Sequence, residues 1–216
     1  MKLLVAVAVF AMANGAFGQL VTQAQFNSAT TRLGYPAPSG AQYNAFNSNL
    51  HKASITTKQE AAMALTHYLH ESDGLRAKRE YRCAQNGCPG EYQTPGCDRN
   101  GQRYYGRGYI QLTWCYNYRQ ASIELYGNDW MVDDADAVAR DEYIAWDTAF
   151  WFWRVNVHSR SGVQEGRFGA TTRAINGGLE CDGAYQHIAR QRFQNYGVVR
   201  SAFGLSGAGD ERGCYN

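Results

Sequence analysis

The sequence lacks an excess of charge of either sign. Its 21 Lys and Arg residues nearly balance 19 Asp and Glu residues, so the formal net charge is +2. Proteins that bind nucleic acid or an anionic membrane surface through bulk electrostatics carry a strong basic excess. The near balance therefore argues against both nucleic acid and membrane surfaces as partners.

Beyond its amino-terminal segment, the sequence also has no long apolar run. The longest run, Leu3 to Ala13, is followed by the small residues Ala16 and Gly18. A helix needs about 20 apolar residues to cross a bilayer, so this run is too short to span one and has the pattern of a secretory signal peptide. We expect residues 1–18 to be a signal peptide and residues 19–216 to form one secreted, extracellular domain.

The cysteines lack the close pairs that bind zinc. No C-x2-C or C-x4-C element occurs among the six cysteines, so we expect no metal site. An even number of cysteines on a chain directed to an oxidising compartment predicts three disulfides. The cysteines are Cys83, Cys88, Cys97, Cys115, Cys181 and Cys214.

Alternation of apolar and polar residues, the pattern of a β-strand, is scarce apart from a short ribbon around residues 104–112. Capping boxes at Thr22 and Thr57 and apolar residues at three- and four-residue steps predict helices instead. We expect them at about 23–33, 43–50, 58–70, 140–153 and 184–196, the last closed by Gly197. Residues 75–103, rich in Gly, Pro, Asn and Cys, predict a loop tied by disulfides. The fold class is therefore mainly α.

Three large aromatic residues, Trp146, Phe150 and Trp153, fall on one face of the predicted helix 140–153. The other faces of this helix are also apolar, and a helix that is apolar on all sides is a buried one. We therefore expect the three rings to pack in the core and not to form a sugar-binding platform.

Glu71 and Glu80 form the pair of carboxyl residues best placed for acid–base chemistry. Glu71 ends an apolar helix, and Asp73-Gly74 breaks the chain direction before Glu80. Burial should raise the pKa of the Glu71 carboxyl, whereas neighbouring cations should favour the carboxylate of Glu80. These cations are Arg76, Lys78, Arg79 and Arg82. Hydrolysis of a glycosidic bond needs such an acid and base, although most glutamate pairs in proteins are plain surface residues.

Two other motif readings fail on their spacing. His67, His70 and Glu71 stand in the order H-x-x-H-E, whereas a zinc peptidase helix reads H-E-x-x-H. Gly106 and Gly108 lack the third glycine and the strand-turn-helix context of a dinucleotide-binding loop. Neither a metallopeptidase nor a dinucleotide-dependent enzyme is predicted.

Four blocks carry a family resemblance. They read HESDG at 70–74, YYGRGYIQLTWCYNY at 104–118, AFWFW at 149–153 and AINGGLEC at 174–181, with Glu80 nine residues after Glu71. In this order they resemble the glycoside hydrolase family 19 chitinases of plants and some bacteria, and the resemblance covers roughly residues 25–200. It implies a two-lobed, lysozyme-like fold with a substrate cleft between the lobes.

The resemblance also implies an activity and its residues. It implies endo-acting, inverting hydrolysis of the β-1,4 bonds between N-acetylglucosamine units of chitin or chitooligosaccharides, with no cofactor, and we expect a monomer. Glu71 matches the proton donor and Glu80 the general base. Residues matching substrate contacts are Gln111, Thr113, Tyr116, Asn117 and Asn176.

The family pattern further implies pairs of cysteines. It joins Cys88 to Cys97 and Cys181 to Cys214, which leaves Cys83 with Cys115 by elimination. Arg107 matches an arginine of the second block, for which a structural ion pair is at least as good an interpretation as a substrate contact. An arginine that the family carries in its last helix has no match, because Arg190 and Arg192 both stand out of register.

Three residues depart from the family pattern. Tyr109 replaces a proline, Cys115 replaces an asparagine, and Asp73 stands before the second glycine, Gly74, of the family's His-Glu-x-Gly-Gly motif. The departures near Tyr109 and Cys115 leave open a peptidoglycan-cleaving hydrolase similar to lysozymes and endolysins. A catalytically inactive sugar-binding defence protein is a further alternative, but retention of both Glu71 and Glu80 argues against it, because sugar binding alone needs no acid and base.

Overall fold

The computed structural model describes residues 19–216, and the predicted signal peptide lies outside the described residues. The helices are α1 (Gln23–Thr31), α2 (Gly40–Asn49), η1 (His51–Ala53), α3 (Lys58–Glu71), α4 (Tyr81–Asn86), α5 (Cys115–Tyr126), α6 (Trp130–Asp133), α7 (Ala137–Arg140), α8 (Glu142–Phe152), η2 (Trp153–Val157), α9 (Phe168–Glu180) and α10 (Gln186–Ala202). Over the described range, β pairing outside these helices is limited to isolated bridges. The mainly α class is therefore confirmed. None of the helices in this range is long and apolar enough to cross a membrane.

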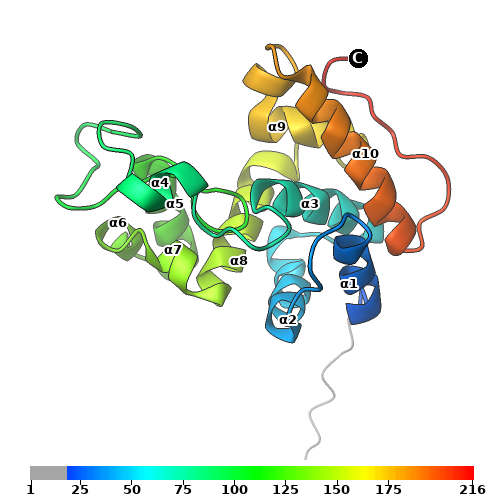
Figure 1. Cartoon of the computed structure of the whole chain (residues 1–216), viewed down its shortest axis with the longest axis horizontal. Helices are drawn as coiled ribbons and strands as arrows, with labels where there is room; N and C mark the ends of the chain where they lie inside the picture. Colours follow the sequence, from blue (N-terminus) through cyan, green and yellow to red (C-terminus); the bar gives the residue numbers. More distant parts are fainter. Residues whose placement is uncertain (1–18) are drawn as a thin grey trace, which may run out of the picture.

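The helices form two lobes with α3 and α8 between them (Figure 1). One lobe contains α4, α5, α6 and α7, and the other contains α1, α2, α9 and α10. α3 packs against α9 and α10, whereas α8 packs against α2, α5 and α7. The two central helices therefore join the lobes, as in the two-lobed architecture that the sequence predicts.

The buried helix α3 is the centre of the core. Its first turn is capped by the side chain of Thr57, which accepts a hydrogen bond from the backbone N–H of Glu60, and every residue from 60 to 69 is buried. The ring of Tyr68 contacts Trp146, Phe150 and Trp153 edge-on, at centroid distances of 5.7, 5.3 and 6.2 Å. The last three side chains are fully buried, so their prediction as core residues is confirmed. Glu71 therefore stands at the end of a rigidly packed helix.

Two predicted elements end differently in the structure. Helix α10 continues through Gly197 to Ala202; a glycine inside a helix costs only about 1 kcal/mol, and the buried side chains of Tyr196 and Val199 on either side of it hold the helix against the core. The predicted ribbon at 104–112 is reduced to a single antiparallel bridge between Arg107 and Leu112, with a second bridge from Arg107 to Arg79.

Two of the three expected disulfides are wrong. The structure joins Cys83 to Cys88 and Cys97 to Cys115, and not Cys88 to Cys97 or Cys83 to Cys115. The reason is local: α4 ends at Gly87, whose left-handed conformation (φ 73°) turns the chain back. This turn brings the Cα atom of Cys88 to 4.8 Å from that of Cys83, which is within the range for a disulfide.

The third pair agrees with the expectation. Cys181, which directly follows α9, is bonded to Cys214 near the carboxyl end of the chain. Across residues 19–216 no cysteine is left unbonded. Two of the disulfides therefore constrain the loop of one lobe, and the third fastens the C-terminal segment to the other lobe.

Replacing Cys97 and Cys115 together by Ser should lower the free energy of unfolding by about 3 kcal/mol, because the bridge closes a long loop in the unfolded chain. For a chain of this size, the loss corresponds to a decrease in Tm of roughly 6 to 12 °C by differential scanning calorimetry. The matched control is the double Ser variant of Cys83 and Cys88, whose sequence separation is 5 and not 18, and which should lose less. Peptide mapping of the unreduced protein that joined Cys88 to Cys97 would contradict the pairing.

Candidate active site

Glu71 is the last residue of α3, and a sharp turn follows it. Asp73, Gly74 and Leu75 all have positive φ angles, of 49°, 69° and 66°. A Cβ atom on residue 74 would lie 2.2 Å from the ring of Tyr35, so this position must be glycine. The hydroxyl of Ser72 ties the turn to the helix, since it donates to the Tyr68 carbonyl and accepts from the Leu75 N–H. The turn reverses the chain, as the Asp73-Gly74 break predicts.

Glu80 is held by the segment that carries the second sequence block. Its backbone N–H donates to the carbonyl of Gly106 at 2.9 Å, and the N–H of Gly106 donates to Oε2 of Glu80 at 3.4 Å. The hydroxyl of Tyr92 donates to the other carboxylate oxygen at 3.2 Å. The carboxylate of Glu80 is therefore oriented by neutral donors.

Most of the cations expected around Glu80 are engaged elsewhere. Arg76 pairs with Asp73, Lys78 with Glu142, Arg79 with Asp136, and Arg82 with Glu91. Of these cations, Arg82 comes nearest to Glu80, at 3.6 Å from Oε1. Of the four cations expected beside Glu80, Arg82 therefore forms an ion pair with it as well as with Glu91, whereas the other three pair with carboxylates elsewhere.

Two adjoining pockets meet at Glu71. The first has a volume of about 360 Å³ and the second about 400 Å³. Glu71, Gln111 and Thr113 line both pockets. Asn117 and Asn176 line the first, and Glu80 lines the second. The structure therefore gathers six of the seven predicted site residues in one continuous groove.

Tyr116, the seventh predicted residue, lines neither pocket. Its ring is 51% exposed and lies nearly parallel to that of Trp114, with the centroids 6.3 Å apart. Trp114 lines the first pocket. The two rings together form an exposed aromatic surface that continues the groove outward from the carboxyl groups.

The polar side chains of the second block are ordered by local hydrogen bonds. The hydroxyl of Thr113 donates to the carbonyl of Gln111 at 2.8 Å, and the side-chain amide of Asn117 donates to the carbonyl of Thr113 at 2.8 Å. The amide of Gln111 donates to the carbonyl of Gly108 at 3.0 Å. A Cβ atom on residue 106 would stand 2.8 Å from Oε1 of Gln111, so glycine there makes room for this side chain.

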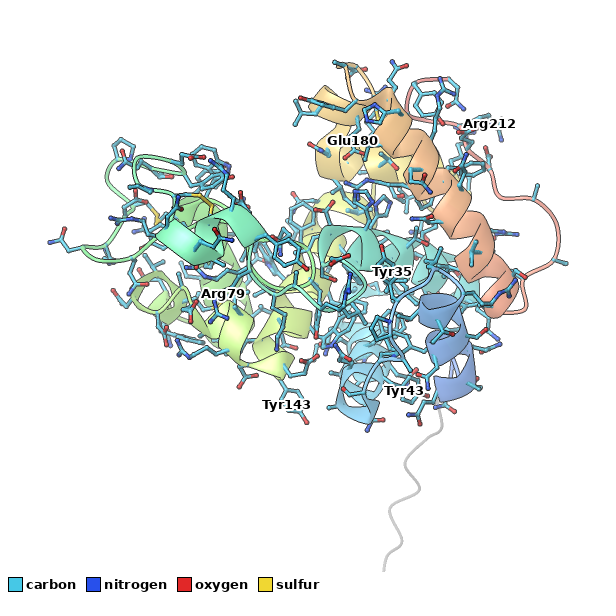
Figure 2. The ribbon with its side chains drawn as sticks, in the orientation of Figure 1. Tyr35, Tyr43, Arg79, Tyr143, Glu180 and Arg212 are labelled. Carbon is cyan, nitrogen blue, oxygen red and sulfur yellow. A yellow bond between two sulfur atoms is a disulfide. The ribbon has the colours of Figure 1, made fainter. Side chains whose placement is uncertain are left out.

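Asn176 comes from the other lobe, at a kink inside α9. Its backbone leaves the helical region, with φ −145° and ψ 36°, and its side-chain amide donates to Oε1 of Glu180 at 2.8 Å. Figure 2 shows Glu180 where α9 and α10 meet, in the lobe opposite to Arg79. The groove is therefore built from both lobes.

Arg192 on α10 is a site residue that sequence reasoning missed. It is 2% exposed, and its Nη2 atom lies 2.6 Å from Oε1 of Glu71 and 2.7 Å from Oε1 of Glu180. A second bond joins its Nε atom to Oε2 of Glu180 at 2.8 Å. Arg192 is therefore the structural candidate for the arginine that the family carries in its last helix. Its signal in the sequence is an arginine on the apolar face of α10, between Ala189 and Tyr196, because a buried guanidinium requires carboxylate partners.

The pKa shifts around Arg192 follow from its charge and burial. Burial alone would raise the pKa of Glu180, but the hydrogen bonds and charge of Arg192 outweigh it and bring this pKa below its usual range. Burial likewise opposes the charge on Arg192, and the carboxylates of Glu71 and Glu180 overcome it, so the pKa of Arg192 is raised. Burial, and then the charge of Arg192, lowers the pKa of His70.

The burial and contacts of Arg107 indicate a structural role. It is 4% exposed, and its guanidinium lies over the ring of Tyr105 at 3.7 Å from the centroid. It donates to the carbonyl of Arg103 and to the hydroxyl of Tyr118, and it pairs with Asp136. Arg107 lines neither pocket, which favours the ion-pair interpretation of this residue.

A set of three potential metal ligands occurs in residues 19–216, and its chemistry does not suit a metal. Glu80, Cys83 and Cys88 place their ligand atoms within 4.8 Å of one another. Both cysteines are joined in a disulfide, and a cysteine binds metal as a thiolate. The cluster therefore carries no candidate metal centre.

Comparison with known sequences gives a single family. The family of chitinase class I, glycoside hydrolase family 19, matches residues 26–165. Acidic endochitinase SP2 of Beta vulgaris is 36% identical over 171 residues, which cover 75% of this chain and 55% of that protein. Chitinase 5 of Oryza sativa subsp. japonica is 37% identical over 162 residues, covering 71% and 52%. The chain thus spans about half the length of these curated relatives.

Solved structures with the same fold are similar over nearly their whole length. Chitinase C from Streptomyces griseus HUT6037 superposes with a TM-score of 0.71 at 28% identity, covering 93% of this chain and 100% of that one. The family GH19, class IV chitinase from Zea mays superposes with a TM-score of 0.65 at 29% identity, covering 88% and 95%. The lysozyme-like fold class is therefore confirmed.

Glu180→Gln should lower the free energy of unfolding by roughly 3 to 5 kcal/mol, because it leaves a buried guanidinium short of one carboxylate. The folded-state pKa of Glu180 lies below the unfolded value of about 4.3, so its stabilisation is present above that pH and is lost as the pH falls through the folded pKa. Urea denaturation should therefore show a gap between wild type and variant at neutral pH that narrows below about pH 4.

Asp182→Asn is the control for this experiment. Asp182 also pairs with an arginine, Arg173, but its side chain is 62% exposed, and exposed pairs contribute little to stability. A Glu180→Gln variant that is no less stable than Asp182→Asn would show that the buried pair does not stabilise the fold.

Proposed function

We propose that this chain, which belongs to the chitinase class I family, glycoside hydrolase family 19, is an endo-acting chitinase. The reaction is hydrolysis of β-1,4 bonds between N-acetylglucosamine units, by inversion at the anomeric carbon. The observation that most supports this function is the second pocket, which Glu71 at the end of the central helix α3 and Glu80 line together with Gln111 and Thr113. Two carboxyl groups facing one groove are what glycoside hydrolysis requires.

Glu71 acts as the general acid in this proposal. It donates its proton to the glycosidic oxygen as the bond from that oxygen to the anomeric carbon breaks. Arg192 and Glu180 form a neutral pair beside it, so a proton on Glu71 leaves this buried group without net charge. Arg192 also fixes the direction of the carboxyl group, since its Nη2 atom lies 2.6 Å from Oε1 of Glu71.

Glu80 acts as the general base. It removes a proton from a water molecule whose oxygen forms the new bond to the anomeric carbon, on the face opposite to the departing oxygen. The bonds from Tyr92 and Gly106 hold its carboxylate in place. The hydroxyl of Thr113 donates to the carbonyl of Gln111, so its lone pairs remain available to accept a hydrogen bond from the attacking water.

The remaining groove residues suit an acetamido sugar. An acetamido group offers one N–H donor and one C=O acceptor, and a side-chain amide supplies both complements. Gln111, Asn117 and Asn176 provide such amides along the groove. The rings of Trp114 and Tyr116 add an apolar surface for a sugar face. Because pockets extend on both sides of Glu71, we infer binding of chitin or chitooligosaccharides across the cleaved bond, which is endo action.

The cellular setting is also a proposal. Three disulfides within residues 19–216 are typical of an oxidising compartment, and the leader-like residues 1–18 agree with export. We infer a secreted, extracellular monomer that needs no cofactor, in which residues 19–216 form the catalytic domain.

Glu71→Gln should lower kcat on chitin oligomers by about 10² to 10⁴-fold, because the amide has no proton to give to the leaving oxygen. KM should change little, since the side chain keeps its size. The measurement is release of reducing ends by the purified variant and the wild type, on chitin oligomers and in parallel on bacterial cell walls.

Glu165→Gln, at an exposed position outside both pockets, is the control and should keep full activity. Near-native turnover by Glu71→Gln would reject Glu71 as the acid. Wild-type activity on cell walls alone would instead assign a peptidoglycan-cleaving enzyme, and activity on neither substrate would indicate a sugar-binding protein.

The first product should carry the α-configuration at its new reducing end. A retaining enzyme needs its carboxyl groups about 5 Å apart, whereas an inverting one needs about 6.5 to 9.5 Å so that a water fits between them. Glu71 ends α3 and Glu80 precedes α4 beyond a sharp turn, and the pocket of about 400 Å³ that both line has room for this water. Proton NMR of the fresh product, read before mutarotation, checks the anomer. A β-anomer would show that Glu80 or the acetamido group of the substrate is the nucleophile.

A further inference from the structure

His67 is a buried histidine one helical turn before Glu71. Residues four apart on a helix lie on the same face, so both side chains of α3 point toward α9 and α10. The imidazole is fully buried. It stacks on the ring of Phe168 of α9, with the centroids 4.8 Å apart and the planes 5° from parallel. His67 lines neither pocket, so it does not reach the substrate groove.

The hydrogen bonds of His67 determine which ring nitrogen carries the proton. Nε2 lies 2.7 Å from Oγ1 of Thr171, and the hydroxyl of Thr171 donates its own proton to the carbonyl of Phe168 at 2.7 Å. This arrangement makes the Thr171 oxygen an acceptor toward the ring and favours the proton on Nε2. Nδ1 is left with a lone pair, which lies 3.2 Å from Nη1 of Arg192 and accepts from it.

This last bond gives the third nitrogen of the buried guanidinium a partner. Nε and Nη2 of Arg192 are taken by the two carboxylates, Glu180 and Glu71. Without an acceptor at Nη1, the planar group would be held along one edge only and could tilt about it. A charged imidazole could not serve, because it has no lone pair on Nδ1.

We propose that His67 is a positioning residue, which through its bare Nδ1 atom fixes the plane of Arg192 and thereby the direction of the Glu71 carboxyl group. The proposal rests on the proposed function for Glu71 as the acid. His67 connects all three helices of this wall, because it belongs to α3, bonds to Thr171 of α9 and bonds to Arg192 of α10. A misplacement of about 1 Å in a catalytic group can cost 10²-fold in rate.

The surroundings of His67 keep it neutral. Burial, and then the charges of Arg192 on α10 and His70 on α3, lowers the pKa of His67 well below its usual value. On the other sides it meets the apolar rings of Phe168 and Trp153. The carboxylates of Glu71 and Glu180 face Arg192 and compensate its charge, so the single lone pair of Nδ1 is available over the working pH range.

Two substitutions of His67 separate the contribution of its hydrogen-bond acceptor from that of its aromatic ring. H67F keeps the stacking on Phe168 but removes the acceptor, and kcat on chitin oligomers should fall by about 10- to 100-fold with KM changed less than about twofold. H67N places an amide oxygen near the position of Nδ1, and it should recover most of that kcat. T66V removes a buried hydroxyl bond from the neighbouring residue of α3 and should keep full activity.

T171V serves where H67F does not fold. It removes the acceptor that keeps the proton on Nε2, and it should lower kcat and leave KM unchanged, in the same pattern. Equal kcat values for wild type, H67F and T171V, or a failure of H67N to exceed H67F, would overturn the proposal.

Nitrogen-15 NMR of the wild-type imidazole gives a test that does not use activity. We expect a protonated Nε2 and a bare Nδ1 that do not titrate between about pH 5 and 8, the range in which an ordinary histidine changes charge. A proton on Nδ1, or a normal titration, would overturn the role of His67. Wild-type protein that hydrolysed no chitin oligomer would overturn the proposed function instead, and the imidazole spectrum would still decide whether Nδ1 can accept from Arg192.

Discussion

The buried guanidinium of Arg192 holds together the wall of the groove that carries Glu71. Removing a charge from water costs several kcal/mol unless good partners replace the water. The partners of Arg192 are Glu71 at the end of α3, Glu180 at the end of α9 and His67 one turn earlier on α3. Since each helix end contributes an atom that the cation requires, α3, α9 and α10 have one favourable arrangement. The kink that brings Asn176 into the groove is fastened to the same group through Glu180.

The opposite wall depends on a second buried arginine. Arg107 lies between the rings of Tyr105 and Tyr118 and pairs with Asp136 at the start of α7. Asp136 also accepts from Arg79, just before Glu80. Hydrogen bonding to Arg79 lowers the pKa of Asp136, so this carboxylate stays charged down to acidic pH. Glu80 is therefore held against the second block by the same kind of constraint that holds Glu71, and the two carboxyl groups line one pocket from independently fixed walls.

The sequence predicts local features well and distant partners poorly. The cap at Thr57 and the apolar faces predict helix α3, and Asp73-Gly74 predicts the turn after Glu71. Both features depend on neighbouring residues. The disulfide of Cys83 was missed because it depends on the direction in which the chain leaves α4. Arg192 was missed because its partners lie on other helices, and no local pattern indicates which carboxylate a buried cation will meet. The charge around Glu80 was predicted only in part for the same reason: Arg82 pairs with Glu80, but the other three cations near it in sequence bind carboxylates elsewhere.

Of the three departures from the family pattern, Tyr109 and Cys115 lie behind the groove, whereas Asp73 lines the second pocket. Tyr109 is fully buried, and its hydroxyl donates to Glu142 of α8 and accepts from Gln42 of α2. Cys115 is likewise buried and is bonded to Cys97. Neither residue lines either pocket. Both side chains therefore fasten the second block from behind, while Gln111, Thr113 and Asn117 of the same block line the first pocket. The two departures that left a peptidoglycan substrate open therefore lie outside the pockets that a sugar would occupy, and this weighs in favour of chitin.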